Sequence, residues 1–151
     1  MSRQHRLMIL SKSSFQHLKR AWVLLCIGGL LTRFVMLRRM CSLPSLVHWF
    51  DAKPAAETED LQQIGWVVQF TDALLRRVYG SDYCIPRSLV IFRFMKRGGY
   101  PVRLHIGMAR IEGKVCGHAW VDLQGQPFAE RTDPHAVFKS LYTYPSPSSF
   151  I

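Results

Sequence analysis

Two residues, Cys84 and His118, are of the types that a nucleophile and its general base require. The cysteine lies in Tyr-Cys-Ile-Pro-Arg-Ser-Leu at residues 83–89, where a helix is predicted to begin, and the histidine lies in Gly-His-Ala-Trp-Val at residues 117–121, within a predicted strand. A thiolate at a helix start beside an imidazole on a neighbouring strand can attack a carbonyl group and form a thioester. The pairing therefore indicates acyl-transfer chemistry. The alternative is a small buried cysteine without a catalytic role.

The helix that must position the cysteine is predicted over residues 84–97. Pro86 fits the first turn of a helix, and two glycines follow the last turn. Cys84 would then stand at the positive end of the helix dipole, where unpaired N–H groups lower the pKa of a thiol and can also bind an oxyanion. Arg87 could orient a substrate or stabilise the fold through an acidic partner, and we favour the structural role. We interpret Ser88, one helical turn beyond Cys84, as a small residue that permits close packing.

A β-hairpin should carry His118. Apolar residues alternate over residues 102–111, a turn is expected at 112–114, and a second strand is expected over 115–123. A further turn at 124–126 would add a third strand. The C-terminal half would thus form a small antiparallel meander packed on the preceding helix, and the fold class is α+β.

A third group must hold the imidazole in its working orientation, and this group is commonly a carboxylate. Glu130, Asp133 and Asp122 are the candidates. His118, Trp120 and Asp122 share one face of their strand because side chains alternate along it, and Trp120 could belong to the core or to a cleft wall. Asp122 is the poorest candidate, since it lies about 13 Å along the strand at roughly 3.3 Å per residue.

The length of the next turn bears on whether Glu130 can reach His118. A three-residue loop, Gln124–Gln126, would pair Glu130 with Trp120 and place it on the histidine's face, whereas a two-residue loop would turn it away. Asp133 would reach the imidazole only if the strand ended and the chain curled back.

The N-terminal third is basic and apolar. Residues 1–53 carry nine lysines and arginines against one acidic residue, whereas the rest carries eleven against nine. Apolar spacing predicts one or two helices over residues 15–40, although Gly28 and Gly29 weaken the case for an unbroken helix. The uncharged run at 21–32 is shorter than the roughly 18 to 20 residues that cross a bilayer. We therefore expect a core or partner-docking helix, with an interfacial amphipathic helix as the alternative.

A linker or turn region is expected over residues 44–59, where Thr58 could cap a helix predicted over 61–79. The chain should form a single domain, residues 1–151, because its apolar content of 48% suffices for one core.

Within this domain we expect three parts. They are a basic helical region at residues 1–53, the core at 54–143 and a flexible tail at 144–151, which is rich in serine and proline.

Four cysteines without disulfide spacing, and no cleavable secretory signal, favour a cytoplasmic protein with free thiols. Cys84, Cys116 and His118 could imitate part of a zinc site, but no fourth ligand accompanies them, so we expect no metal and no cofactor. The basic region could meet an acidic protein or an anionic membrane. Nucleic acid is not expected as a partner, because no recognition motif accompanies the charge.

These motifs resemble a bacterial family, the transglutaminase-like cysteine proteases of lasso-peptide biosynthesis, which remove the leader from a precursor peptide. The likeness covers nearly the whole chain. It is most specific at Cys-Ile-Pro-Arg-Ser-Leu (84–89), at Lys-Arg-Gly-Gly-Tyr (96–100), at Ile-Gly (106–107) and at His-Ala-Trp-Val (118–121). The basic, aliphatic segment at 20–39 is also similar.

The resemblance implies a transglutaminase- or papain-like core in which Cys84 is the nucleophile and His118 the base. It places the acid at Glu130, where aspartate is usual, with Asp133 as the alternative. It also implies three partners: the precursor peptide, a separate leader-recognition protein and an ATP-dependent macrolactam synthetase. Two other functions stay open, namely acyl transfer to an amine and a non-catalytic docking role in a peptide-maturation complex. The basic N-terminal helix could also make a peripheral membrane contact.

Overall fold

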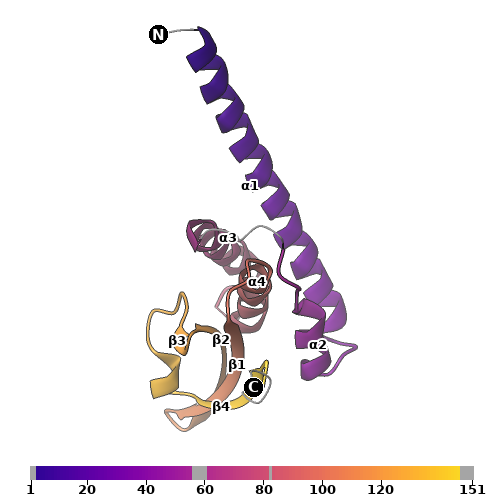
Figure 1. Ribbon diagram of the computed structural model, residues 1–151. Coiled ribbons are helices and arrows are strands. Elements are labelled where there is room, and N and C mark those ends of the chain that lie inside the picture. Colours follow the sequence, from indigo (N-terminus) through magenta and orange to yellow (C-terminus); the bar gives the residue numbers. More distant parts are fainter. Residues whose placement is uncertain (1–2, 56–60, 82, 147–151) are drawn as a thin grey trace.

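The computed structural model describes residues 3–55, 61–81 and 83–146, and it describes side chains from residue 18 onward, apart from Lys19. Four helices precede a four-stranded sheet (Figure 1). The helices are α1 (Arg3–Leu37), α2 (Leu43–Phe50), α3 (Leu61–Tyr79) and α4 (Cys84–Arg97). The strands are β1 (Val102–Ile111), β2 (Lys114–Leu123), β3 (Gln126–Pro127) and β4 (Lys139–Tyr144), and a short 3-10 helix, η1 (Pro134–Ala136), precedes β4.

The sheet is antiparallel with the strand order β3-β2-β1-β4. The β1–β2 turn is the pair Glu112–Gly113, with φ of 50° and 80°, and the β2–β3 turn is Gln124–Gly125, with φ of 54° and 82°. Two successive residues with positive φ form the tight turns that match the twist of antiparallel strands. The expected hairpin and the α+β class are therefore confirmed, and β4, which the sequence analysis did not identify, pairs with β1 at the far edge.

Helix α4 is the central element of the core. Its residues Leu89, Phe92 and Met95 are fully buried, and it packs against α3 and the sheet. From the sheet, Val121 on β2 joins the same core, as Leu104 on β1 does. The predicted bounds of α3 and α4 are confirmed to the residue, because strong apolar periodicity and the following glycines determine both ends.

The N-terminal region differs from expectation in two respects. Helix α1 continues unbroken through Gly28 and Gly29, where an added Cβ would meet no atom within 4 Å, so the glycines mark no close contact. Part of the expected linker is instead helix α2, whose first turn contains Pro44. Proline fits that position because its missing N–H would have no helical partner there. The predicted cap Thr58 lies outside the described residues, and so do residues 147–151 of the expected tail.

Helix α1 also contains a longer apolar segment than the uncharged run suggested. Its residues 20–37 have a mean hydropathy of 1.6, so this segment is long and apolar enough, by length and composition alone, to cross a membrane. The uncharged run at 21–32 is still shorter than a membrane span, and the longer segment passes the criterion because that criterion allows the two arginines, Arg20 and Arg33. In the structure, 17% of the residues in this segment are buried. They are Ile27, Leu30 and Phe34, which pack against the core.

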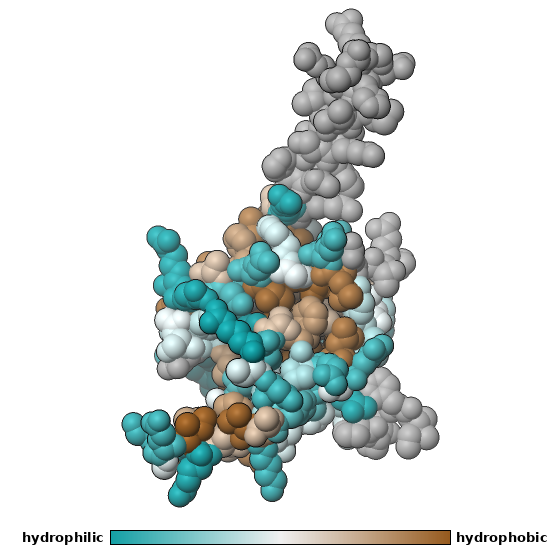
Figure 2. Space-filling view, turned by 90° about the vertical axis from the view of Figure 1, so that its left-hand side faces the viewer, coloured by the Kyte–Doolittle hydropathy of each residue, from teal (hydrophilic) through white to brown (hydrophobic). Residues whose placement is uncertain are grey.

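Hydrophobic side chains are also found on the molecular surface. Figure 2 shows them gathered in the middle of one face, with hydrophilic side chains around them. On α1 the exposed large hydrophobic residues include Leu18, Trp22, Leu25 and Met36. A group of exposed hydrophobic residues such as this one on α1 is typical of a surface that contacts another molecule.

Candidate active site

Cys84 and His118 meet where α4 begins and β2 passes beside it. Both side chains line the same cleft, and His118 is among the groups that lower the pKa of the Cys84 thiol. Both side chains are half-buried. Their elements are fixed to each other by a second contact one helical turn away, since Ser88 Oγ donates to the Ala119 carbonyl at 2.7 Å in the buried interior.

The environment of Cys84 favours its thiolate. Burial raises the pKa of the Cys84 thiol, but the hydrogen bond from His118, the backbone N–H of Ala119, the charge of His118 and the backbone N–H of Ile85 together outweigh it, so the pKa is lowered. The hydrogen bond to Cys84, followed by that to Glu130, raises the pKa of His118 to about 9. These opposite shifts both favour transfer of the thiol proton to the imidazole, which is the direction that activates a nucleophilic cysteine.

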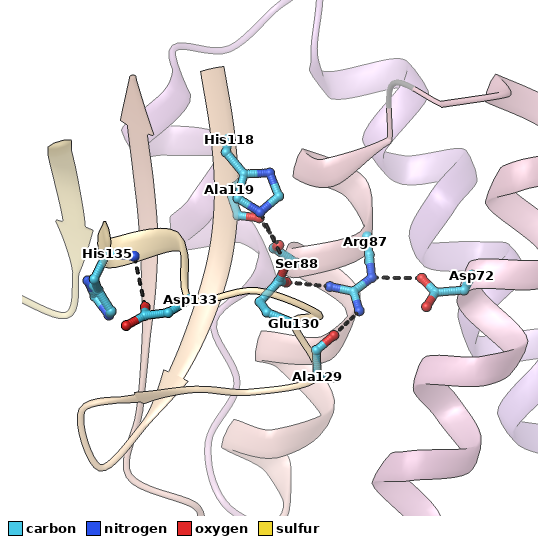
Figure 3. Close-up of polar contacts among 9 residues, drawn as sticks. All are labelled: Asp72, Arg87, Ser88, His118, Ala119, Ala129, Glu130, Asp133 and His135. Atoms are coloured by element: carbon cyan, nitrogen blue, oxygen red, sulfur yellow. Dashed lines mark hydrogen bonds and ion pairs between the residues drawn. The ribbon is translucent and has the colours of Figure 1, made fainter. Parts of the chain in front are cut away.

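Glu130 is the carboxylate that contacts the imidazole. Its Oε2 lies 3.2 Å from His118 Nε2, which leaves Nδ1 as the ring nitrogen available to the sulfur. The other two candidates have different partners. Asp133 accepts a hydrogen bond from the His135 N–H at 2.9 Å and caps η1, as Figure 3 shows, and Asp122 Oδ2 lies 2.9 Å from His135 Nε2.

Glu130 reaches this position by a route that the turn argument did not foresee. The β2–β3 loop has two residues, which was expected to turn Glu130 away from the histidine. That expectation is wrong because the strand ladder ends at Pro127. Beyond it, Phe128 N–H still donates to the Val121 carbonyl at 2.8 Å, and Ala129 adopts a φ of 59°, which reverses the chain. The side-chain alternation of a strand therefore does not apply at Glu130.

Arg87 holds this reversed segment in place (Figure 3). Its guanidinium donates through Nη1 to Glu130 Oε1 at 2.7 Å, through Nη2 to the Ala129 carbonyl at 2.6 Å, and through Nε to Asp72 Oδ1 at 2.7 Å. The acidic partner expected for Arg87 is thus present, and there are two of them. The positive φ of Ala129 is unusual for a residue with a Cβ, and the bond to its carbonyl stabilises that conformation.

Trp120 supports the histidine from behind and does not line the cleft. The indole is fully buried and stacks on the His118 ring with centroids 6.0 Å apart and an interplanar angle of 13°. On its other side it stacks on His105 at 5.2 Å and 11°. The ring of Phe138 lies 5.1 Å from that of His118. The sequence analysis missed Phe138, because its contact depends on a loop whose path has no periodic signal.

A second polar cluster lies on the same sheet face. Asp122 is 4% exposed, and its Oδ2 lies 3.0 Å from His105 Nε2 and 2.9 Å from His135 Nε2. This contact ties η1 to the sheet, so the loop that carries Glu130 is held near both of its ends. Among the residues that the structure describes, no group of histidine, cysteine, aspartate and glutamate is arranged to hold a metal ion.

The thiol opens onto a cleft of about 840 Å³. One side of the cleft comes from Phe34 and Arg38 of α1 and from the last turns of α3, and the other comes from the segment between Ala129 and Phe138. A cleft of this size can hold a short peptide segment. Its position gives a bound carbonyl group direct access to Cys84.

Comparison with known proteins identifies a family. The model of a family described as the transglutaminase-like superfamily matches residues 24–143, which run from the middle of α1 to β4. No curated protein and no solved structure matches the chain significantly. The matched residues include the whole of α4, strands β1 to β3 and all of β4 except Tyr144, and thus every residue of the site described above.

Proposed function

Because the chain belongs to the transglutaminase-like superfamily, whose members have cysteine protease or acyltransferase activity, we propose that it is a cysteine peptidase that removes the leader from a lasso-peptide precursor. The observation that carries this proposal is that Cys84 and His118 line one cleft, with Glu130 Oε2 3.2 Å from His118 Nε2. The motif resemblance around both residues supports the choice of substrate.

In the proposed reaction, Cys84 Sγ attacks the carbonyl carbon at the junction between leader and core. His118 gives its proton to the departing amine of the core peptide as the C–N bond breaks, and a thioester joins the leader to Cys84. His118 then takes a proton from water, whose oxygen attacks the thioester. The leader leaves with a new carboxylate, and the thiolate is restored. A macrolactam synthetase would next close the ring on the released core.

Two groups would assist these steps. Glu130 keeps the imidazole oriented through Nε2 and stabilises its positive charge, as the third member of a cysteine–histidine–acid triad does. The backbone N–H of Cys84 lies in the first turn of α4, where helical N–H groups have no partner within the helix. It would donate to the oxyanion of the tetrahedral intermediate.

We propose that leader recognition comes from a separate protein. The described chain is occupied by the helices, the sheet and the connections around the cleft, and a small leader-binding module is not among its elements. The basic N-terminal region would be the docking face for that protein or for the leader itself, because an acidic partner is drawn to its charge.

The proposal is tested with the precursor peptide encoded beside this chain's gene, incubated with the protein and the expected leader-recognition protein. Mass spectrometry should find two products that sum to the precursor plus one water, with one junction cut. An uncut precursor under these conditions would overturn the protease assignment.

Acyl transfer to an amine is the second candidate, since the same thioester can react with an amine in place of water. Water enriched in ¹⁸O separates the two. A peptidase incorporates the heavy oxygen into the new leader carboxylate, whereas an acyltransferase given an added primary amine forms a leader amide. Amide as the main product would favour the second candidate.

A further inference from the structure

The charge of the cleft suggests which peptides it accepts. Two carboxylates line it, Asp72 and Glu130, and both are bonded to Arg87. Neither is therefore free to repel an anionic ligand. Three further arginines line the same cleft: Arg38 from the end of α1, Arg76 from α3 and Arg131 from the loop after Glu130.

These three arginines are exposed, and none of them forms an ion pair within the part of the chain that the structure describes. They come from three separate parts of the chain that converge on the cleft. Four arginines thus face two carboxylates there, and a concave site with one dominant sign of charge raises the local concentration of oppositely charged ligands. Guanidinium groups also bind carboxylates in a directional, bidentate way.

We infer, building on the proposed function, that the cleft accepts a peptide segment with carboxylate side chains close to the scissile bond. Arg38, Arg76 and Arg131 would bind those carboxylates, and Cys84 would attack the backbone between them. The arginines are binding residues in this account and take no part in bond breaking.

The test measures binding rather than cleavage, so that it does not depend on turnover. Two short fluorescein-labelled peptides, identical except that one carries glutamate where the other carries glutamine, are titrated into the Cys84→Ala protein. We expect the glutamate peptide to bind about tenfold more tightly at low salt, with the difference shrinking as salt rises. Equal affinities would overturn the inference.

Matched variants separate the cleft from the general positive charge of the protein. Arg76→Gln should reduce the preference for the glutamate peptide. Arg77→Gln, which removes the same charge from the adjacent residue of α3 that does not line the cleft, should leave the preference unchanged. Equal losses in the two variants would also overturn the inference. Charge-selective binding without any cleavage of the precursor would instead contradict the proposed function alone.

A second observation concerns the side of α1 that faces away from the core. Leu18, Trp22, Leu25 and Met36 recur at helical spacing and are between 63% and 70% exposed, whereas Ile27 and its neighbours on the opposite side are buried. We call these four exposed residues the outer face of α1. A helix that is apolar on both sides normally has a second apolar contact.

The charge around this face indicates the occupant. Arg39 is exposed just beyond the end of this helix, and residues 1–53 carry nine basic residues against one acidic residue. Apolar residues with tryptophan, flanked by arginine and lysine, match the interface of an anionic lipid bilayer. We propose that the outer face of α1 lies on such a membrane surface while Ile27 and Phe34 keep the helix packed on the core.

Vesicle flotation tests this proposal. The protein should float with vesicles of phosphatidylcholine and phosphatidylglycerol and remain in the lower fraction with phosphatidylcholine alone. Trp22→Glu should abolish flotation, whereas Val115→Glu, at a residue 60% exposed on β2, should not. Failure to float with the anionic vesicles would overturn the proposal. Trp22→Glu converting a dimer to a monomer, without any lipid binding, would show that a second copy covers this face.

Discussion

Arg87 Nη1 donates to Glu130 Oε1 at 2.7 Å, on the carboxylate whose second oxygen lies 3.2 Å from His118 Nε2. One carboxylate thus connects a helix residue three positions after Cys84 to the histidine on β2. Since Arg87 also binds Asp72 on α3, two helices and the loop meet at a single guanidinium. We regard Arg87 as a positioning residue that acts on the chemistry through Glu130.

Arg87→Gln should destabilise the protein and lower its activity. The Arg87 side chain is 12% exposed and the Glu130 side chain 13%, so the substitution leaves a mostly buried carboxylate without its partner. Breaking such a pair costs about 3 kcal/mol of unfolding free energy. Urea denaturation measures this loss, with exposed Arg110→Gln as the control. An unchanged urea unfolding midpoint for Arg87→Gln would show that the bond between Arg87 and Glu130 does not stabilise the fold.

Glu130→Gln should reduce kcat/KM about 100-fold, which is the usual scale for loss of a group that supports a general base. Asp133→Asn should have little effect on the rate, because Asp133 caps η1 and does not contact the imidazole. Steady-state cleavage of the precursor compares the two variants. A loss of rate confined to Asp133→Asn would transfer the role of the acid to Asp133.

The pH profile of kcat/KM should have a basic limb near pH 9. The hydrogen bond with Cys84 and then that with Glu130 raise the pKa of His118 to about 9, and the imidazolium must keep its proton for the departing amine. Activity should therefore be present below that pH and fall as pH rises through it. In Glu130→Gln the limb should move to lower pH, because one of the groups that raise the pKa has lost its charge. An unmoved limb would contradict the contact between Glu130 and His118.

Gly107→Ala should destabilise the sheet. A Cβ at Gly107 would lie 2.7 Å from the Lys139 carbonyl oxygen and 3.0 Å from the Trp120 ring, in a region where β4 and the indole close over β1. Overpacking of this kind costs on the order of 1–3 kcal/mol of unfolding free energy. Gly117→Ala is the matched control, since its Cβ would meet its nearest atom at 3.9 Å. Thermal or urea denaturation should separate the two variants, and equal stability would argue against this packing.

Residue periodicity predicted the elements that carry the chemistry. Helices α3 and α4 and the β1–β2 hairpin have long, regular apolar patterns that end at glycines, so their positions followed from the sequence. These elements bring Cys84 and His118 to one cleft. Helix α2 did not follow, because eight residues that begin near a proline resemble a linker when only turn residues are considered.

The path to Glu130 could not be predicted for a different reason. It depends on a tertiary contact, the bond from Arg87 to the Ala129 carbonyl, which stabilises a positive φ that alanine would otherwise avoid. Side chains would alternate up to Glu130 in a continuing strand, but the strand ends at Pro127. Glu130 was the correct residue to consider, and the reason for its position lies in the fold rather than in strand alternation.

The central claim is that the Cys84 thiolate attacks the peptide, and the cleavage products of the precursor test it most directly. Mass spectrometry should detect leader and core after incubation with the wild-type protein and only intact precursor after incubation with Cys84→Ala. The variant's circular dichroism spectrum and unfolding midpoint should match the wild type, which shows that it is folded. Continued cleavage at the same bond by folded Cys84→Ala protein would contradict the account.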